Sequence, residues 1–298
     1  AIPKTALQAQ QFGQVNLVQD IASALLKSYC QRYYNWKKSE YESQHLETII
    51  LDKNDPNFNE WRYWIEVKQN QTDIIENLKK LKNSVETEVL DEDNPFIKTN
   101  IDTDKITAFS FVRHLYKPLL YITNKYPQGL IRISPVALND GERQFVEDLK
   151  DYYSSHKDFF ENRQLFLLRN MSKKGIGFFQ ANNFYPDFIL WLVEGNHQYI
   201  AFLDPKGLMN ITGIKHPKIQ FYKTIKTDIE AQIHKTDTNI SLSSFIISNT
   251  SFNRLKHWQS GETIADFNSH NVYFQDGQQY EYIGKILRKV VEKQKPSH

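Results

Sequence analysis

Two acidic residues and a lysine near residue 200 have the types and spacing that phosphodiester chemistry requires. The run Tyr199–Leu203 is apolar at every position, so we expect a strand that is covered on both faces. It leads directly into Asp204 and Lys206, whose side chains project from the same face because side chains alternate along a strand. Charges at the end of such a strand are unfavourable unless they are paired or bound to a metal.

A further carboxylate is expected at the same end of the sheet. Phe188–Val193 predicts another apolar strand, and Glu194–Gln198 predicts the hairpin turn between the two strands. Asp187 directly precedes this hairpin, which would bring it beside Asp204. Carboxylate oxygens hold Mg²⁺, the bound ion activates water, and a lysine offsets the charge that develops on phosphate. These side chains therefore predict metal-dependent phosphodiester hydrolysis.

The preceding helix offers a third acidic residue, and helix geometry separates two possibilities. We predict a helix from Asp140 to Tyr153, in which Glu142 lies in the middle of the apolar stripe. Glu147 is about 140° further around the helix and should face solvent. We therefore predict that Glu142 points toward the sheet and the two aspartates. The alternative is a first-turn glutamate that is favoured by the helix dipole alone.

The sequence around these residues resembles the PD-(D/E)xK nuclease superfamily. The resemblance rests on Asn183–Phe188 followed by Phe202–Gly207. More narrowly, the chain is similar to the C-terminal nuclease region of type III restriction-type DEAD/DEAH helicase-nucleases, in which stretches like Leu167–Asn170 and Gly175–Phe179 precede the catalytic hairpin. The similar region covers roughly residues 130 to 275.

The chain departs from the commoner pattern of this superfamily in one residue. Asp204 stands where many relatives carry Glu, which leaves a metal ligand in place. Pro205 lacks the N–H that a sheet ladder needs, so we also expect the strand to end or bulge there.

The resemblance implies an Mg²⁺-dependent DNA endonuclease, with Mn²⁺ as a substitute ion. Asp187 and Asp204 would bind the metal, and Glu142 would hold a second ion or an outer-shell water. Lys206 would orient the attacking water or stabilise the transition state. The resemblance also implies a helicase or translocase region that precedes Ala1, a restriction or phage-defence role, and a DNA methyltransferase subunit as a partner.

A non-catalytic role is the alternative. In that case a nuclease-like module would dock the motor to DNA or to the methyltransferase. The aromatic-rich residues 29–64 could form the docking surface, although we expect core packing for most of these rings.

Glu66-Val67-Lys68 is a literal ExK sequence that we reject as a site. Ile65 and Val67 alternate with Glu66 and Lys68, as in a half-buried strand with one polar face. A solvated ion-pair face explains these charges, and no Pro-Asp precedes them on a partner strand.

Two basic segments are candidates for contacts with DNA phosphates. Lys173 and Lys174 lie in a glycine-containing loop, and Lys215 and Lys218 begin a basic stretch that continues through the helix expected over residues 217–234. Solvated surfaces are the alternative for both pairs.

The composition limits the other possibilities. A formal charge of +2 excludes a global cationic field, so DNA binding must rest on local patches. Cys30 is the only cysteine, which excludes an intrachain disulfide and a cysteine-rich zinc site and favours the reducing cytoplasm. We see no signal peptide and no apolar run long enough to span a membrane. Because the chain begins at Ala1 rather than Met, we expect a processed protein or a piece of a longer one.

The pattern of apolar residues changes near residue 128. We predict a mainly α-helical domain over residues 1–127, with one short strand and an exposed acidic loop at 91–104, which connects to the preceding motor. Residues 128–298 alternate between strand and helix patterns and are predicted to form the nuclease domain. The expected fold class is α/β, with a restriction-endonuclease-like mixed β-sheet flanked by helices.

Overall fold

The computed structural model describes residues 15–44, 64–91, 95–101, 105–114, 118–123, 129–134, 136–170, 176–178, 184–208, 213–257, 261–276 and 280–292. The chain divides into two compact units, Ala1–Leu51 and Asp52–His298, and each is described by itself. No helix in these stretches is long and apolar enough to cross a membrane. The domain boundary expected between residues 127 and 128 stays a prediction.

The first unit contains a long helix, α2 (Val15–Gln44), in agreement with the helical character expected there. Leu25, Leu26, Tyr29 and Tyr33 of this helix are exposed. The rings of Tyr29 and Tyr33 stack on each other with their centroids 6.5 Å apart. Core packing, expected for most rings of residues 29–64, is therefore absent for the described tyrosines of this helix.

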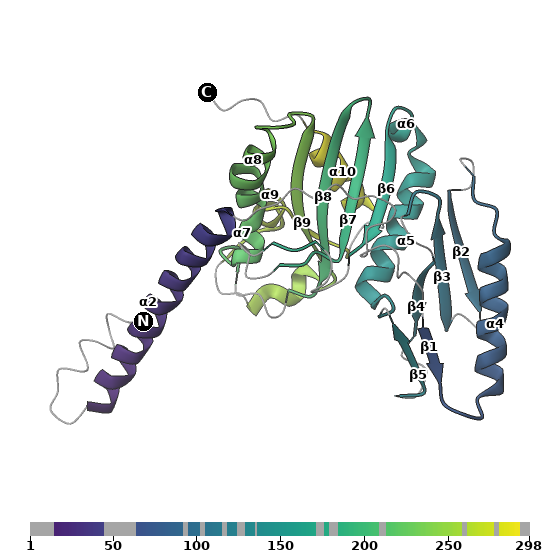
Figure 1. Cartoon of the computed structure of the whole chain (residues 1–298), viewed down its shortest axis with the longest axis horizontal. Coiled ribbons are helices and arrows are strands. Elements are labelled where there is room, and N and C mark those ends of the chain that lie inside the picture. The colour runs from purple at the N-terminus through teal and green to yellow at the C-terminus, as the bar shows by residue number, and fades with distance from the viewer. Residues whose placement is uncertain are drawn as a thin grey trace. The chain divides into compact units, whose positions relative to one another are not determined.

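The second unit is built around a five-stranded sheet in the order β10-β9-β8-β7-β6 (Figure 1). The strands are β6 (Gln164–Arg169), β7 (Phe188–Glu194), β8 (His197–Lys206), β9 (Ile240–Ser248) and β10 (Val272–Phe274). β6, β7 and β8 pair in an antiparallel way. β9 then pairs in parallel with β8, and β10 pairs in parallel with β9. The predicted α/β class and the predicted apolar hairpin are confirmed.

β8 continues through Pro205 to Lys206, so the expected end or bulge at Pro205 is wrong. The reason lies in the pairing on the two sides of β8. The ladder with β7 ends at Leu203, whereas the ladder with β9 continues to Lys206. The Lys206 carbonyl accepts a hydrogen bond from Asn249 on the β9 side, 3.2 Å away, so the missing N–H of Pro205 faces the side where β7 has already ended.

Helices α5 (Asp140–Ser155) and α10 (Glu281–Val291) cover one face of this sheet. The ring of Phe145 on α5 packs against Phe188 of β7 with the centroids 5.0 Å apart. α10 approaches α5 closely because Gly284 has no side chain: a Cβ atom there would lie 2.8 Å from the ring of Tyr152. The strong apolar stripe of each helix thus faces the sheet and its neighbour.

A continuous run of helix covers the opposite face of the sheet (Figure 1). It consists of α7 (Pro217–Thr224), the π-helical η2 (Ile225–Glu230) and α8 (Ala231–Ile233). The rings of Phe202 on β8 and Phe221 on α7 both contact Phe178, with centroids 4.7 and 4.8 Å away. The even-numbered residues near the end of β8 therefore face α7, and the odd-numbered ones face α5.

Three shorter elements complete this part of the unit. They are α6 (Lys157–Phe160), the 3-10 helix η3 (Phe252–His257) and α9 (Ile264–Ser269). Phe252 and Phe267 from the last two pack on Phe274 of β10 and cover the edge strand.

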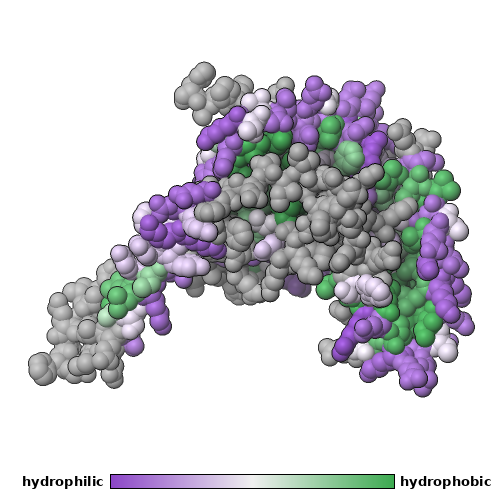
Figure 2. Space-filling model, viewed as in Figure 1, coloured by the Kyte–Doolittle hydropathy of each residue, from purple (hydrophilic) through white to green (hydrophobic). Residues whose placement is uncertain are grey.

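Residues before 128 contain more strand than the sequence predicts. β2 (Phe96–Ile101), β3 (Ile106–Phe111) and β4 (Leu119–Ile122) form an antiparallel sheet, and β1 (Trp64–Val67) pairs with β5 (Ile131–Ser134). α4 (Thr72–Thr87) packs on the three-stranded sheet through Leu81 and presents a hydrophilic outer side (Figure 2). The expected loop over 91–104 and the mainly helical character expected of residues 1–127 are thus wrong where these strands lie.

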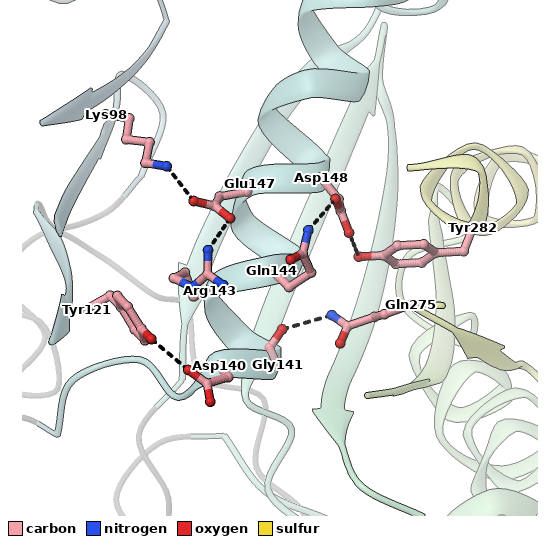
Figure 3. A network of polar contacts seen from close by, with 10 residues as sticks. All are labelled: Lys98, Tyr121, Asp140, Gly141, Arg143, Gln144, Glu147, Asp148, Gln275 and Tyr282. Carbon is pink, nitrogen blue, oxygen red and sulfur yellow. Dashed lines mark hydrogen bonds and ion pairs between the residues drawn. The ribbon is translucent and has the colours of Figure 1, made fainter. Parts of the chain in front are cut away.

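A polar network extends from α5 to the elements on either side of it (Figure 3). Toward α10, the buried carboxylate of Asp148 accepts hydrogen bonds from the Tyr282 hydroxyl at 2.7 Å and from Gln144 at 2.8 Å. Burial raises the pKa of Asp148, and these two donors oppose that shift. The Tyr282 hydroxyl therefore stabilises a carboxylate that has little access to water.

We expect Tyr282→Phe to lower the free energy of unfolding by about 1–3 kcal/mol, because the buried Asp148 carboxylate loses one of its two donors. Tyr280→Phe is the matched control, since its hydroxyl bonds Ser155 at 3.3 Å on the surface. Urea unfolding of both variants, followed by circular dichroism, measures the difference. Equal stability of the two variants would contradict this role for Tyr282.

Candidate functional site

The hairpin places Asp187 and Asp204 at one edge of the five-stranded sheet. Phe188 pairs with Leu203 at the last position of the β7–β8 ladder. Asp187 directly precedes the first of these residues and Asp204 directly follows the second, so the two aspartates flank the last pair of the ladder. Asp204 is buried, at 5% exposure, and Asp187 is half-buried.

Lys206 contacts Asp204 directly. Its Nζ donates a hydrogen bond to Oδ2 of Asp204, and the two side chains are 23% and 6% exposed. The same ammonium lies 5.4 Å from the ring centroid of Phe184, on the α7 side of the sheet. Lys206 thus pairs with the buried carboxylate of Asp204, and its ammonium also lies near an aromatic ring.

Burial and, next in size, the neighbouring Lys218 ammonium lower the pKa of Lys206 from 10.5 to about 7. The negative charge of Asp187 opposes this shift. The contact with Asp204 also opposes it, because a carboxylate stabilises the ammonium form. The lysine is therefore more easily deprotonated than one in water.

Glu142 faces inward and is only 4% exposed, as the helix stripe predicts. Its Oε2 accepts from the backbone N–H of Asn139 at 2.8 Å, while the Asn139 side chain accepts from the backbone N–H of Glu142, which completes a capping box. Nη2 of Arg169 lies 3.2 and 3.0 Å from its two carboxylate oxygens. Glu142 therefore caps α5 and pairs with a cation at the end of β6.

Glu147, expected in solvent, is instead largely covered and paired. It accepts from Lys98 of β2 at 2.6 Å and from Arg143 at 2.5 Å, and its side chain is 17% exposed (Figure 3). It points away from the five-stranded sheet, as predicted, but toward a second sheet rather than toward water. The helix pattern could not reveal this, because the three-stranded sheet beside it was not predicted.

Asp187 lies between two ion pairs. Burial raises the pKa of its carboxyl, whereas the positive charges of Lys206, Arg169 and Lys218 oppose the shift, in that order of size. Arg169 pairs with Phe188 in the β6–β7 ladder and belongs to the face that α5 covers. Lys206 belongs to the face that α7 covers. Positive charges from both faces of the sheet therefore act on the Asp187 carboxylate.

The candidate DNA-contacting lysines have different positions. Lys218, on the first turn of α7, lies 5.9 Å from the ring centroid of Phe184, which Lys206 also approaches. Lys215 is exposed in the turn before α7. Lys173 and Lys174 lie outside the described residues. The structure therefore brings Lys218 to the carboxylates, a position that its pattern on the helix did not indicate.

Arg169 is the main residue that the sequence analysis missed. It was considered only as part of the stretch before the hairpin. Its signal was an arginine at the end of an apolar strand, which is the same signal that identified Lys206. What could not be seen was that α5 places Glu142 within 3.0 Å of it.

Asp187 and Asp204 are the residues of this edge that could hold a divalent cation. Among the described residues, no three His, Cys, Asp or Glu side chains form a group suited to a metal ion. Glu142 is turned toward Arg169 on the opposite face from Asp204, which accounts for this. Mg²⁺ is commonly bound by only one or two carboxylates, together with water and substrate phosphates, so two hard oxygen donors at one edge fit it.

The rejected ExK sequence lies on the short strand β1. Glu66 is exposed and stands opposite Arg132 of β5, whereas Ile65 and Val67 are half-buried. This confirms the predicted polar face.

Comparison with known proteins adds no relative: no family model, no curated protein and no solved structure matches this chain. The function must therefore be inferred from the site.

We expect Arg169→Met to lower the free energy of unfolding by about 3–5 kcal/mol, because it leaves the buried Glu142 carboxylate without its cation. Arg163→Met is the matched control, since Arg163 pairs at 2.9 Å with the more exposed Glu194 and should lose only about 1 kcal/mol. A second change, Glu142→Leu, should recover part of the loss in Arg169→Met. Urea unfolding of Arg169→Met, Glu142→Leu, their double variant and Arg163→Met tests this, and an additive double variant would contradict the pairing.

Proposed function

We propose that this chain is an Mg²⁺-dependent DNA endonuclease of the PD-(D/E)xK type, on a restriction-endonuclease-like fold. The observation that carries the proposal is that Asp187 and Asp204 flank the last pair of an apolar hairpin, with the half-buried Lys206 paired to Asp204. Three carboxylates and three cations in one region otherwise have no structural necessity, because apolar residues would stabilise the same sheet edge.

The side chains divide the reaction between them. Asp187 and Asp204 would hold Mg²⁺, which when bound supplies Lewis-acid chemistry toward the phosphate and its attacking water. Lys206, whose pKa is lowered toward neutrality, would orient that water or offset the charge that develops on the phosphate in the transition state. Lys218 adds a second positive charge on the same side of the sheet. Glu142, held by Arg169, suits an outer-shell water better than a second ion.

The wider assignment follows the resemblance alone. The chain would be the C-terminal part of a cytoplasmic restriction or phage-defence helicase-nuclease. DNA would be its substrate, an N-terminal helicase region would move it, and a methyltransferase subunit would be a further partner. Mn²⁺ would replace Mg²⁺.

A non-catalytic module remains the second candidate, and the ion pairs favour it. Arg169 already neutralises Glu142 and Lys206 already neutralises Asp204, so the cluster is satisfied without a metal. The exposed aromatic rings of α2, including Tyr33 and Trp36, would then suit contact with a motor or methyltransferase.

A nicking assay separates the two candidates. The wild-type chain should convert supercoiled plasmid to open circles with Mg²⁺ or Mn²⁺ and stop when EDTA removes the ion. Asp204→Asn and Lys206→Met should each lower the rate by about 100-fold or more, because each removes a group that acts on the transition state. Glu66→Gln, on β1, should cut like the wild type. If the wild-type chain nicks plasmid no faster than the background rate with either Mg²⁺ or Mn²⁺, the result would favour the non-catalytic module.

Metal titration distinguishes the ligands from the lysine. Asp187→Asn and Asp204→Asn should weaken the binding of Mn²⁺ measured by calorimetry, since each removes a charged oxygen ligand. Lys206→Met should bind Mn²⁺ at least as tightly as the wild type, because a protonated lysine offers no lone pair and its removal frees Asp204. If Lys206→Met lost metal binding while the aspartate variants kept it, the roles would be reversed.

A further inference from the structure

An open pocket with a volume of about 490 Å³ lies beside the carboxylates. Its walls come from the first two turns of α5, the turn after β9, η3 and the residue after β10. The lining residues are Asp140, Gly141, Arg143, Gln144, Asn249, Thr250, Arg254 and Gln275. None of these was predicted as a site residue.

Asn249 is the wall that the pocket shares with the candidate site. Its backbone N–H donates to the carbonyl of Lys206 at 3.2 Å. A Cβ atom built on Gly141, the residue before Glu142, would lie 2.8 Å from Nδ2 of Asn249, and one on Gly207 would lie 3.2 Å from its Oδ1. The pocket therefore continues the carboxylate site along the same edge of the sheet, past β8 toward β9 and β10.

The lining is suited to an anion. Arg254 is exposed on η3, and Asn249 offers an exposed amide. The one acidic side chain, Asp140, accepts from the Tyr121 hydroxyl at 2.7 Å, on the other side of the first turn of α5 from Gln275 (Figure 3). Gln275 donates to the carbonyl of Gly141 at 2.8 Å, which fixes this wall. Arg143 pairs with Glu147, so within the described part of the chain the guanidinium of Arg254 is the positive charge at the pocket that has no ion-pair partner.

Among the residues that the structure describes, the lining also has no aromatic ring on which a base could stack. Proteins that hold single bases use such rings, whereas the sequence-independent part of nucleic-acid binding comes from arginine, lysine and amide contacts to phosphates. An open polar pocket, next to a site for phosphodiester cleavage, therefore suits a sugar-phosphate backbone better than a base or a free nucleotide.

We propose that this pocket binds a backbone phosphate of the DNA strand that flanks the scissile phosphate, with Arg254 and Asn249 as its ligands. The inference rests on the proposed function. The Arg254 guanidinium would donate two N–H groups to the phosphate oxygens, and the amide of Asn249 would donate another. This contact would align the strand along the edge so that the next phosphate reaches Asp187 and Asp204.

The test measures equilibrium binding of a labelled duplex to the full chain in EDTA, so that cleavage does not interfere. Arg254→Gln should weaken binding about 10-fold and reduce the slope of log K against log salt by about 0.9, the value for one lost phosphate contact. Asn249→Ala should weaken binding with little change in slope. Arg132→Gln, an exposed arginine on β5, is the matched control and should bind like the wild type.

The outcomes separate this proposal from the nuclease proposal. If Arg254→Gln keeps the affinity and salt slope of Arg132→Gln, the pocket proposal is overturned, even where the wild type nicks plasmid. If Arg254→Gln shows the loss but the wild type cuts no DNA, the pocket stands and the nuclease proposal fails. Titration with inorganic phosphate identifies the other source of this chemistry: saturation that depends on Arg254, without any binding of the duplex, would overturn the assignment to DNA.

Discussion

The placement of charge at the end of a fully covered strand is the constraint on which the rest of the site depends. β8 is apolar from Tyr199 to Leu203, then carries Asp204 and Lys206 into an environment that penalises ions. Each charge is tolerated because the other lies against it. The pair needs β7 to end before it and β9 to continue beside it, which is the arrangement that the ladder registers give. The sheet is antiparallel on one side of β8 and parallel on the other. Both aspartates lie at the edge where the antiparallel ladder ends.

The helix α5 supports that edge in a second way. Its first turn is closed by a capping box, and the glutamate of the box also pairs with Arg169 from β6. One carboxylate thus fixes the start of the helix and the end of a strand relative to each other. Removal of the cation leaves a buried charge, so the pair ties the local stability of the helix to the shape of the site. On the other face, the ammonium groups of Lys206 and Lys218 both lie near the ring of Phe184.

The same edge explains why the pocket and the carboxylates belong together. Asn249 lies between the glycine before Glu142 and the glycine after Lys206, and a side chain at Gly141 would collide with it. Two glycines therefore permit the close approach of three segments that are far apart in the chain. In the proposed binding mode, a DNA strand along this edge would contact Lys206 and Lys218 beside the carboxylates and Arg254 in the pocket. A small ligand would reach only one of these two places.

The sequence by itself determined the hairpin, the α/β class and the inward direction of Glu142, because alternation and helical periodicity act over a few residues and were read directly from Tyr199–Leu203 and the stripe of α5. It also gave Asp187, Asp204 and Lys206 as candidates, since charges that flank an apolar strand stand out in any window. The tertiary structure alone decided the partners. Arg169 reaches Glu142 across 27 positions of sequence, Lys98 reaches Glu147 across 49, and Gln275 reaches Gly141 across 134. It also decided strand β2 at residues 96–101, where packing against α4 and β3 overrides an acidic, loop-like composition, and the continuation of β8 through Pro205. These outcomes depend on which surfaces meet, and no local pattern of residue types specifies that.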